Sequence, residues 1–127
     1  MTEAKLFLRL DLASHVRLGP GKIRLLEEIA RLGSISAAGR ALKMSYRRAW
    51  LLVDELNSSF REPVVTTRLG GTGGGTASVT PLGTSVIRAY RTMETEAQRI
   101  VRRRFAALMA QLRESPRRAR GKVARRP

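Results

Sequence analysis

The apolar residues near the start of the chain alternate with polar or aromatic ones. Leucine occupies every second position from Leu6 to Leu12, and Phe7, Arg9 and Asp11 stand between the leucines. Alternation with a period of two places one set of side chains on one face of an extended backbone. The pattern therefore predicts a strand with one buried face.

A helical spacing replaces this alternation after the break at Gly19–Gly21. Pro20 suits the first turn of a helix, where the missing amide hydrogen would have no intrahelical partner. Gly33 is a typical residue to end the helix. The apolar residues expected on the inner face of this helix are Ile23, Leu25, Leu26, Ile29, Ala30 and Leu32.

Residues 33–57 have the pattern of a short helix, a tight turn and a second helix. Ser34 or Ser36 is expected to cap the first helix, and Ser45 the second. The turn at Lys43–Met44 directs the methionine into the core. The residues expected to face inward are Ala38 and Leu42 in the first helix, and Ala49, Val53 and Leu56 in the second.

Two segments rich in β-branched residues, Val64–Arg68 and Ala77–Thr80, flank a glycine-rich stretch over residues 70–76. They predict a hairpin with a long tip rather than a tight two-residue turn. Thr80 followed by Pro81 is a strong signal for the start of another helix.

The last helix is predicted to run from Pro81 to Arg113, roughly 50 Å at ~1.5 Å per residue, before Ser115–Pro116 stops it. Such a helix is longer than the rest of the domain is wide, so its apolar face needs a second copy of the chain. The residues expected at this dimer interface are Val86, Tyr90, Met93, Ala97, Val101, Phe105 and Leu108, with Leu112 continuing the series.

Together, these elements predict a mainly α fold with a small β-wing, a winged helix-turn-helix with a long C-terminal dimerisation helix. We expect a winged helix-turn-helix domain in residues 1–80, the dimerisation helix in residues 81–113 and a basic tail in residues 114–127. The tail contains almost no apolar residues, which predicts disorder.

The formal net charge of +15 favours an anionic polymer as the partner. Residues 1–98 contain 14 Lys/Arg and 9 Asp/Glu, a net of +5, whereas residues 99–127 contain 11 Lys/Arg against Glu114, a net of +10. This asymmetry predicts a basic arm. The Arg102–Arg104 run and the tail would form a basic patch in a dimer, with a merely solubilising tail as the alternative.

Enzymatic and metal chemistry have little support. Cysteine is absent, His15 is the single histidine, and the adjacent carboxylates Glu27–Glu28 and Asp54–Glu55 point to different helix faces. Gly70–Thr76 has the glycine spacing of a phosphate-binding loop, but threonine stands where that motif requires lysine, and a strand follows. We therefore expect no enzyme, no metal and no cofactor.

The sequence contains no apolar run of ~18 residues, so we expect no membrane partner. The expected location is the cytoplasm, in association with the bacterial nucleoid.

Several segments resemble, in order, the N-terminal DNA-binding domain of the ModE family of molybdate-responsive transcription regulators. They are Gly33–Ser36, Ser45–Trp50, Glu55–Asn57, Thr67–Arg68 before the glycine-rich wing, and Leu82–Gly83 at the start of the long helix. The resemblance covers about residues 4–112, and a more distant one links the chain to the DNA-binding head of LysR-type regulators. It implies a homodimer on a palindromic site.

Regulators of the ModE family carry molybdate-binding modules after the long helix, where this sequence has a basic tail. We therefore expect no molybdate site in these residues. In one alternative, the chain is a protein-interaction module whose partner is a separately encoded molybdate-binding protein.

The helix over residues 45–57 is expected to enter the major groove of double-stranded DNA, which is ~12 Å wide. Arg47 is expected to read guanine, and Tyr46 to contact a phosphate or a thymine methyl group. Trp50 has two interpretations, DNA contact or packing between this helix and the wing. The expected DNA-binding residues are Ser34, Ser36, Arg40, Lys43, Ser45, Tyr46, Arg47, Arg48, Trp50, Arg68 and Thr72.

The alternatives at these positions are plain surface roles for Arg40 and Lys43, a solvated helix face for Arg47 and Arg48, and a structural ion pair for Arg68. The prediction is a sequence-specific transcription regulator that binds a palindromic operator as a homodimer, with molybdenum-related genes as expected targets. The alternative is a nucleoid-type architectural or RNA-associated basic protein without strong sequence preference.

Overall fold

The computed structural model describes residues 4–70 and 75–117. In chain order, its elements are β1 (Leu10–Ala13), β2 (Val16–Leu18), α1 (Pro20–Leu32), α2 (Ile35–Ala41), α3 (Tyr46–Ser59), β3 (Val65–Arg68), β4 (Thr76–Val79) and α4 (Pro81–Met109). The predicted fold class is confirmed: the protein is a mainly helical winged helix with a long C-terminal helix.

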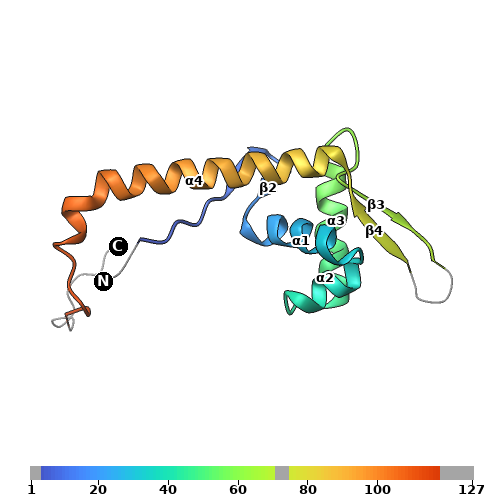
Figure 1. The fold of residues 1–127 in the computed structure, drawn as a ribbon, viewed down its shortest axis with the longest axis horizontal. Helices are drawn as coiled ribbons and strands as arrows, with labels where there is room; N and C mark the ends of the chain where they lie inside the picture. Colours follow the sequence, from blue (N-terminus) through green and yellow to red (C-terminus); the bar gives the residue numbers. More distant parts are fainter. Residues whose placement is uncertain (1–3, 71–74, 118–127) are drawn as a thin grey trace.

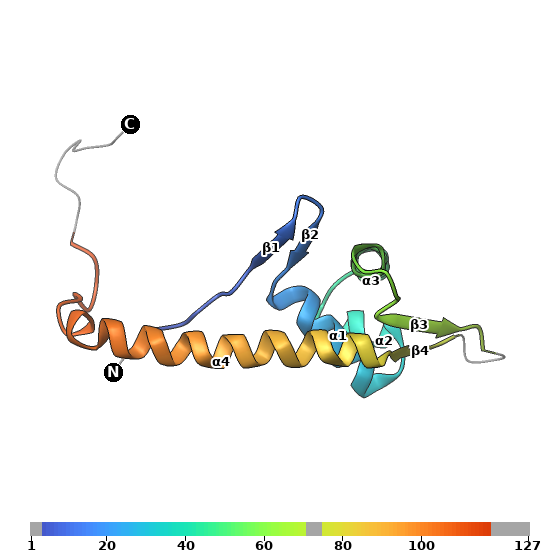
Figure 2. The same ribbon diagram turned by 90° about the horizontal axis from the view of Figure 1, so that it is seen from above.

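The three short helices gather at one end of α4, and the β3–β4 wing extends from that same end beyond them (Figure 1). The wing is an antiparallel pair in which Val65 faces Val79 and Arg68 faces Thr76. A second antiparallel hairpin, β1–β2, stands away from α4 on one side (Figure 2). The long helix therefore carries the helix-turn-helix and the wing at one end only.

The core lies between α1, α3 and the base of the wing. Leu26 and Ile29 of α1, Leu56 of α3 and Val64 before the wing are all fully buried. The predicted inner faces of α1 and α3 are thus correct, except that Ala30 and Leu32 are exposed. Leu52 is a further buried residue of α3 that the four-and-three spacing did not single out.

Glycine ends α1 as predicted, and this position also ties α1 to the wing. Gly33 has a φ of 71°, a left-handed conformation that costs a residue with a Cβ atom more than it costs glycine. Its amide donates to the carbonyl of Ile29 at 2.8 Å, and its own carbonyl accepts from the amide of Ala77 at 2.9 Å. The wing strand β4 is therefore hydrogen-bonded to the junction of α1 and α2.

The predicted strand over residues 6–12 is only partly correct. Strand β1 begins at Leu10 and pairs with β2, which the sequence pattern did not predict because it is only three residues long. The residues before β1 lie along α4 instead of in a sheet: the Gln98 side chain donates to the carbonyl of Ala4 at 2.9 Å, and the Tyr90 hydroxyl donates to that of Leu8. The alternation marked an extended segment with one covered face, and a helix covers that face.

Helix α4 begins where predicted and ends earlier than predicted. The Thr80 hydroxyl accepts from the amide of Gly83 at 3.0 Å and donates to the carbonyl of Pro63 at 2.8 Å. The helix stops at Met109 rather than Arg113. Leu112 is 64% exposed, so no packing stabilises a further turn.

Candidate nucleic-acid interface

The helix-turn-helix is held in shape by a serine at the start of each helix. The Ser34 hydroxyl accepts from the amide of Ala37, and the Ser45 hydroxyl from that of Arg48, both at 3.1 Å. Ser34, rather than Ser36, is therefore the cap of α2. Between the helices, Lys43 adopts a φ of 59°, the single left-handed conformation outside glycine in the described part of the chain.

Helix α3 presents one buried face and one exposed face. Ala49, Val53 and Leu56 pack in the core, while Tyr46, Arg47 and Arg48 in the first turn are exposed, Tyr46 by 64%. In helix-turn-helix complexes, the corresponding end of the second helix reaches the base edges. The structure thus leaves the predicted base-reading residues accessible.

Trp50 occupies the boundary between α3 and the wing. It packs at the margin of the core, and its ring meets that of Tyr46 edge-on at a centroid distance of 6.2 Å. Both aromatic residues, together with Thr67 and Arg68 of β3, line a hollow of about 240 Å³ between the helix-turn-helix and the wing. The indole Nε1 of Trp50 is buried and has no hydrogen-bond partner among the described residues.

Some cations of the described chain are paired with carboxylates, and the predicted DNA-binding cations are not among them. Arg9, Lys22, Arg31 and Arg91 each form an ion pair with a carboxylate. Among the residues that the structure describes, no ion pair or hydrogen bond is made by the side chains of Arg40, Lys43, Arg47, Arg48 or Arg68, and all five are exposed. The positive charge on α2, the turn, α3 and the wing is therefore free to meet an anion.

Of the other residues expected to touch DNA, Ser36 is partly buried and lines the hollow beside the wing. Thr72 lies outside the described residues. The ion pair considered for Arg68 does not form with any described residue.

Asn57 fixes the wing to the recognition helix, a role that the sequence pattern did not reveal. Its side-chain Oδ1 accepts from the amides of Val64 at 2.8 Å and Val65 at 3.1 Å, and its Nδ2 donates to the carbonyl of Val65 at 3.0 Å. One amide side chain thus supplies three hydrogen bonds to the buried start of β3. The feature of the sequence that could have revealed this role is an asparagine near the end of α3, before the first strand of the wing.

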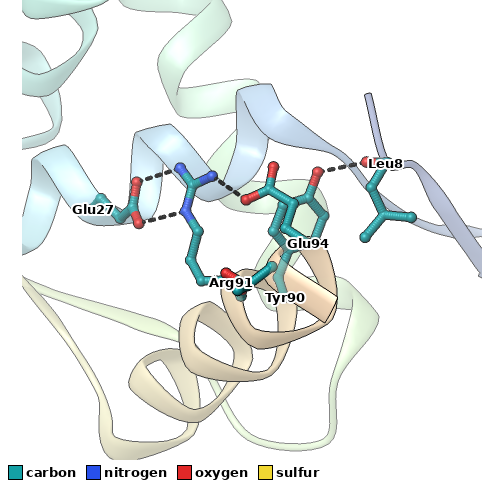
Figure 3. A network of polar contacts seen from close by, with 6 residues as sticks. Leu8, Glu27, Tyr90, Arg91 and Glu94 are labelled. Carbon is teal, nitrogen blue, oxygen red and sulfur yellow. Dashed lines mark hydrogen bonds and ion pairs between the residues drawn. The ribbon is translucent and has the colours of Figure 1, made fainter. Parts of the chain in front are cut away.

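An ion-pair network joins α1 to α4 (Figure 3). Arg91 donates to both carboxylate oxygens of Glu27, at 2.8 and 2.9 Å, and to Glu94 at 2.6 Å. These hydrogen bonds lower the pKa of Glu27, since they favour the carboxylate form. Burial raises the pKa of the neighbouring Tyr90, because a phenolate would lose its hydration.

The predicted dimer face of α4 needs one correction. Tyr90 is 1% exposed and contacts its own chain, so it is not available to a second copy. Along the rest of the helix, Met93, Phe105 and Leu108 are exposed by 38%, 49% and 55%, and Val86, Ala97 and Val101 are partly buried. Ile100, which the pattern did not single out, is 49% exposed and extends the apolar surface.

Two further kinds of site find no support in the described residues, a metal centre and a membrane-spanning helix. No group of three histidine, cysteine or carboxylate side chains lies close enough to hold a metal ion within the described ranges. No helix in the described part of the chain is both long and apolar enough to cross a membrane.

Comparison with known proteins agrees with this geometry. The chain is 42% identical over 87 residues to the molybdenum-pterin-binding protein MopA of Rhodobacter capsulatus and 37% identical over 100 residues to the molybdenum transport protein ModE of Azotobacter vinelandii. It is 35% identical over 88 residues to the DNA-binding transcriptional dual regulator ModE of Escherichia coli. The N-terminal part of this chain is a ModE-family winged-helix domain.

These matches span 68%, 77% and 69% of this chain but only 33%, 37% and 34% of the respective relatives. The chain therefore spans about a third of the length of the curated relatives that it matches. No protein-family model matches the chain. The resemblance to the ModE family is confirmed for the domain, and the functions named for the whole relatives do not transfer with it.

Proposed function

We propose that this protein is a sequence-specific transcription regulator that binds a palindromic operator as a homodimer, with molybdenum-related genes among its targets. The observation that carries the proposal is the set of unpaired, exposed cations on α2, the turn, the first turn of α3 and the wing. The relative named as a DNA-binding transcriptional dual regulator supports the same function. The site of action is chromosomal DNA in the cytoplasm.

In this proposal, α3 enters the major groove with its N-terminal turn foremost. Arg47 reads guanine through its two terminal nitrogens, and Tyr46 contacts the backbone or a thymine methyl group. Ser45 and the start of α3 face a phosphate, which the free amides of a helix N-terminus favour. The cations of α2 and the turn, Arg40 and Lys43, neutralise phosphates and contribute affinity without sequence preference.

The dimer brings two such surfaces to one duplex. The exposed apolar residues on the outer half of α4, from Met93 to Leu108, provide the face that a second copy covers. Because Arg91 and Glu27 hold α4 against α1, the dimer fixes the separation of the two recognition helices. The expected half-site separation is one helical turn of DNA, about 34 Å, or a multiple of it.

The test is a selection of genomic fragments by the purified full-length chain, followed by titration of an enriched duplex and a random duplex at several salt concentrations. A regulator keeps a ratio of roughly 10³ or more between the two affinities. An architectural or RNA-associated basic protein would bind both duplexes alike. Enriched palindromes near molybdenum-related genes would support the proposed pathway.

Arg47→Ala provides a sharper test of base reading. We expect a loss of about tenfold or more on the enriched duplex and a smaller loss on the random one, since a bidentate guanine contact discriminates by ~1–3 kcal/mol. Arg61→Ala is a charge-matched control, because Arg61 is exposed and follows the opposite end of α3. Equal losses of Arg47→Ala on both duplexes would contradict the assigned role.

A further inference from the structure

One leucine on the wing is almost fully exposed. Leu69 follows the last residue of β3 and is 96% exposed, more than any other large apolar side chain in the described part of the protein. A side chain that exposed contributes almost nothing to the hydrophobic stabilisation of the domain. The side chain is therefore available to whatever the wing meets.

The surroundings of Leu69 tie it to the recognition surface. It follows Arg68, whose guanidinium has no partner among the described residues, and it lines the same hollow as Tyr46 and Trp50 of α3. The ladder beneath it is regular up to the pair of Arg68 and Thr76. Leu69 therefore stands on an ordered strand end, beside the helix proposed to read the major groove.

The two strands of the wing also lie close together at this outer end of the ladder. A Cβ atom added at Gly75 would lie 3.0 Å from the carbonyl oxygen of Arg68, so the two chains approach closely because one residue is glycine. A narrow two-stranded blade suits the minor groove of DNA, which is only ~6 Å wide, better than a helix does. Proteins that bind this groove often press an apolar side chain against a base step.

We propose that Leu69 is an apolar minor-groove wedge, placed against a base step that flanks the major-groove site of α3. This inference rests on the proposed DNA-binding function and adds a specificity residue to it. Unstacking a step is easiest at flexible pyrimidine–purine steps. Leu69 therefore selects such a step in the half-site, while the adjacent Arg68 neutralises a phosphate or enters the groove beside it.

The test compares Leu69→Ala with Leu12→Ala, a matched change at an exposed leucine on the β1–β2 hairpin. The probe is the duplex enriched from genomic fragments by the unchanged protein, labelled at successive steps with a fluorescent base analogue that brightens when unstacked. We expect Leu69→Ala to bind about tenfold more weakly, because the shorter side chain cannot reach the base step, with the same salt dependence and no brightening. Leu12→Ala should match the unchanged protein, and Leu69→Met should retain most of both signals.

The outcomes separate the wedge from the proposed function. If the unchanged protein prefers the enriched duplex and Leu69→Ala equals it in affinity and brightening, the wedge does not exist and the regulator remains. If the unchanged protein shows no preference between enriched and random duplexes, the proposed function itself fails. A reduced salt dependence in Leu69→Ala would also overturn the wedge, because it would point to an indirect effect on phosphate contacts.

Discussion

Asn57 offers the clearest prediction about how the recognition helix and the wing stay together. Replacing it by alanine removes three hydrogen bonds at the start of β3, where Val64 is fully buried and Val65 is 2% exposed. The amides of both valines are then left without this side-chain acceptor. Water cannot readily replace it at such a buried position.

The expected destabilisation follows from these hydrogen bonds. At ~1 kcal/mol for each of them, Asn57→Ala lowers the free energy of unfolding by roughly 3 kcal/mol. For a domain of this size, that corresponds to a fall in Tm of roughly 10–15 °C. Asn57→Asp keeps an acceptor for both amides and removes the donor to the carbonyl of Val65, so its destabilisation should be smaller, about 1–2 kcal/mol.

The assay is thermal and urea unfolding, followed by circular dichroism and by the fluorescence of Trp50, the single tryptophan of the chain. Ser59→Ala is the control on the same helix, because its hydroxyl bonds to the carbonyl of Glu55 within the helix, and we expect a change within ~0.5 kcal/mol. A Tm for Asn57→Ala within two or so degrees of the unchanged protein (~0.5 kcal/mol) would refute the reasoning. So would an Asn57→Asp variant as unstable as Asn57→Ala.

Three further changes test the junctions of the fold. Gly83→Ala should lower the free energy of unfolding in urea by at least ~1–3 kcal/mol, because its Cβ would lie 2.4 Å from the carbonyl oxygen of Val64. A Cβ added at Gly21 meets no atom within 4 Å, so Gly21→Ala should raise the free energy of unfolding by ~0.5–1 kcal/mol. Equal changes in the two variants would contradict the close approach of Gly83 to Val64. For the Arg91 ion pair, the lowered pKa of Glu27 means that its stabilisation is present above about pH 4.5 and is lost as the pH falls through the lowered value. Glu27→Gln should therefore be less stable than the unchanged protein at pH 7 and equally stable in acid, which unfolding midpoints measured across pH would show. A difference in midpoint that stays constant with pH would refute this dependence on the Glu27 carboxylate.

The start and end signals of the helices were predictable because they act over a few residues. Ser34, Ser45 and Thr80 cap helices through hydrogen bonds to amides three positions later, and Gly33 ends α1 through its own backbone conformation. The buried faces of the helices followed from periodicity for the same reason. The winged-helix order of elements, and the exposed first turn of α3, therefore came from local information.

The sequence did not reveal which distant segments meet. Residues 4–8 lie along α4 through hydrogen bonds that cross more than eighty positions, and this packing buries Tyr90 in its own chain. Asn57 reaches the wing, and Arg91 reaches Glu27 across 64 positions. No spacing in the sequence encodes such pairs, because an extended segment or an arginine has the same local pattern whichever partner it finds.

By itself, then, the sequence determined the set of helices, their caps, their apolar faces and the cationic surface of the helix-turn-helix. Only the tertiary structure decided which cations stay unpaired, which apolar residues of α4 remain open, and where the wing stands relative to α3. The physical reason is that propensity, capping and amphipathicity are summed over neighbours along the chain. Pairing and burial depend instead on groups brought together only when the chain has folded.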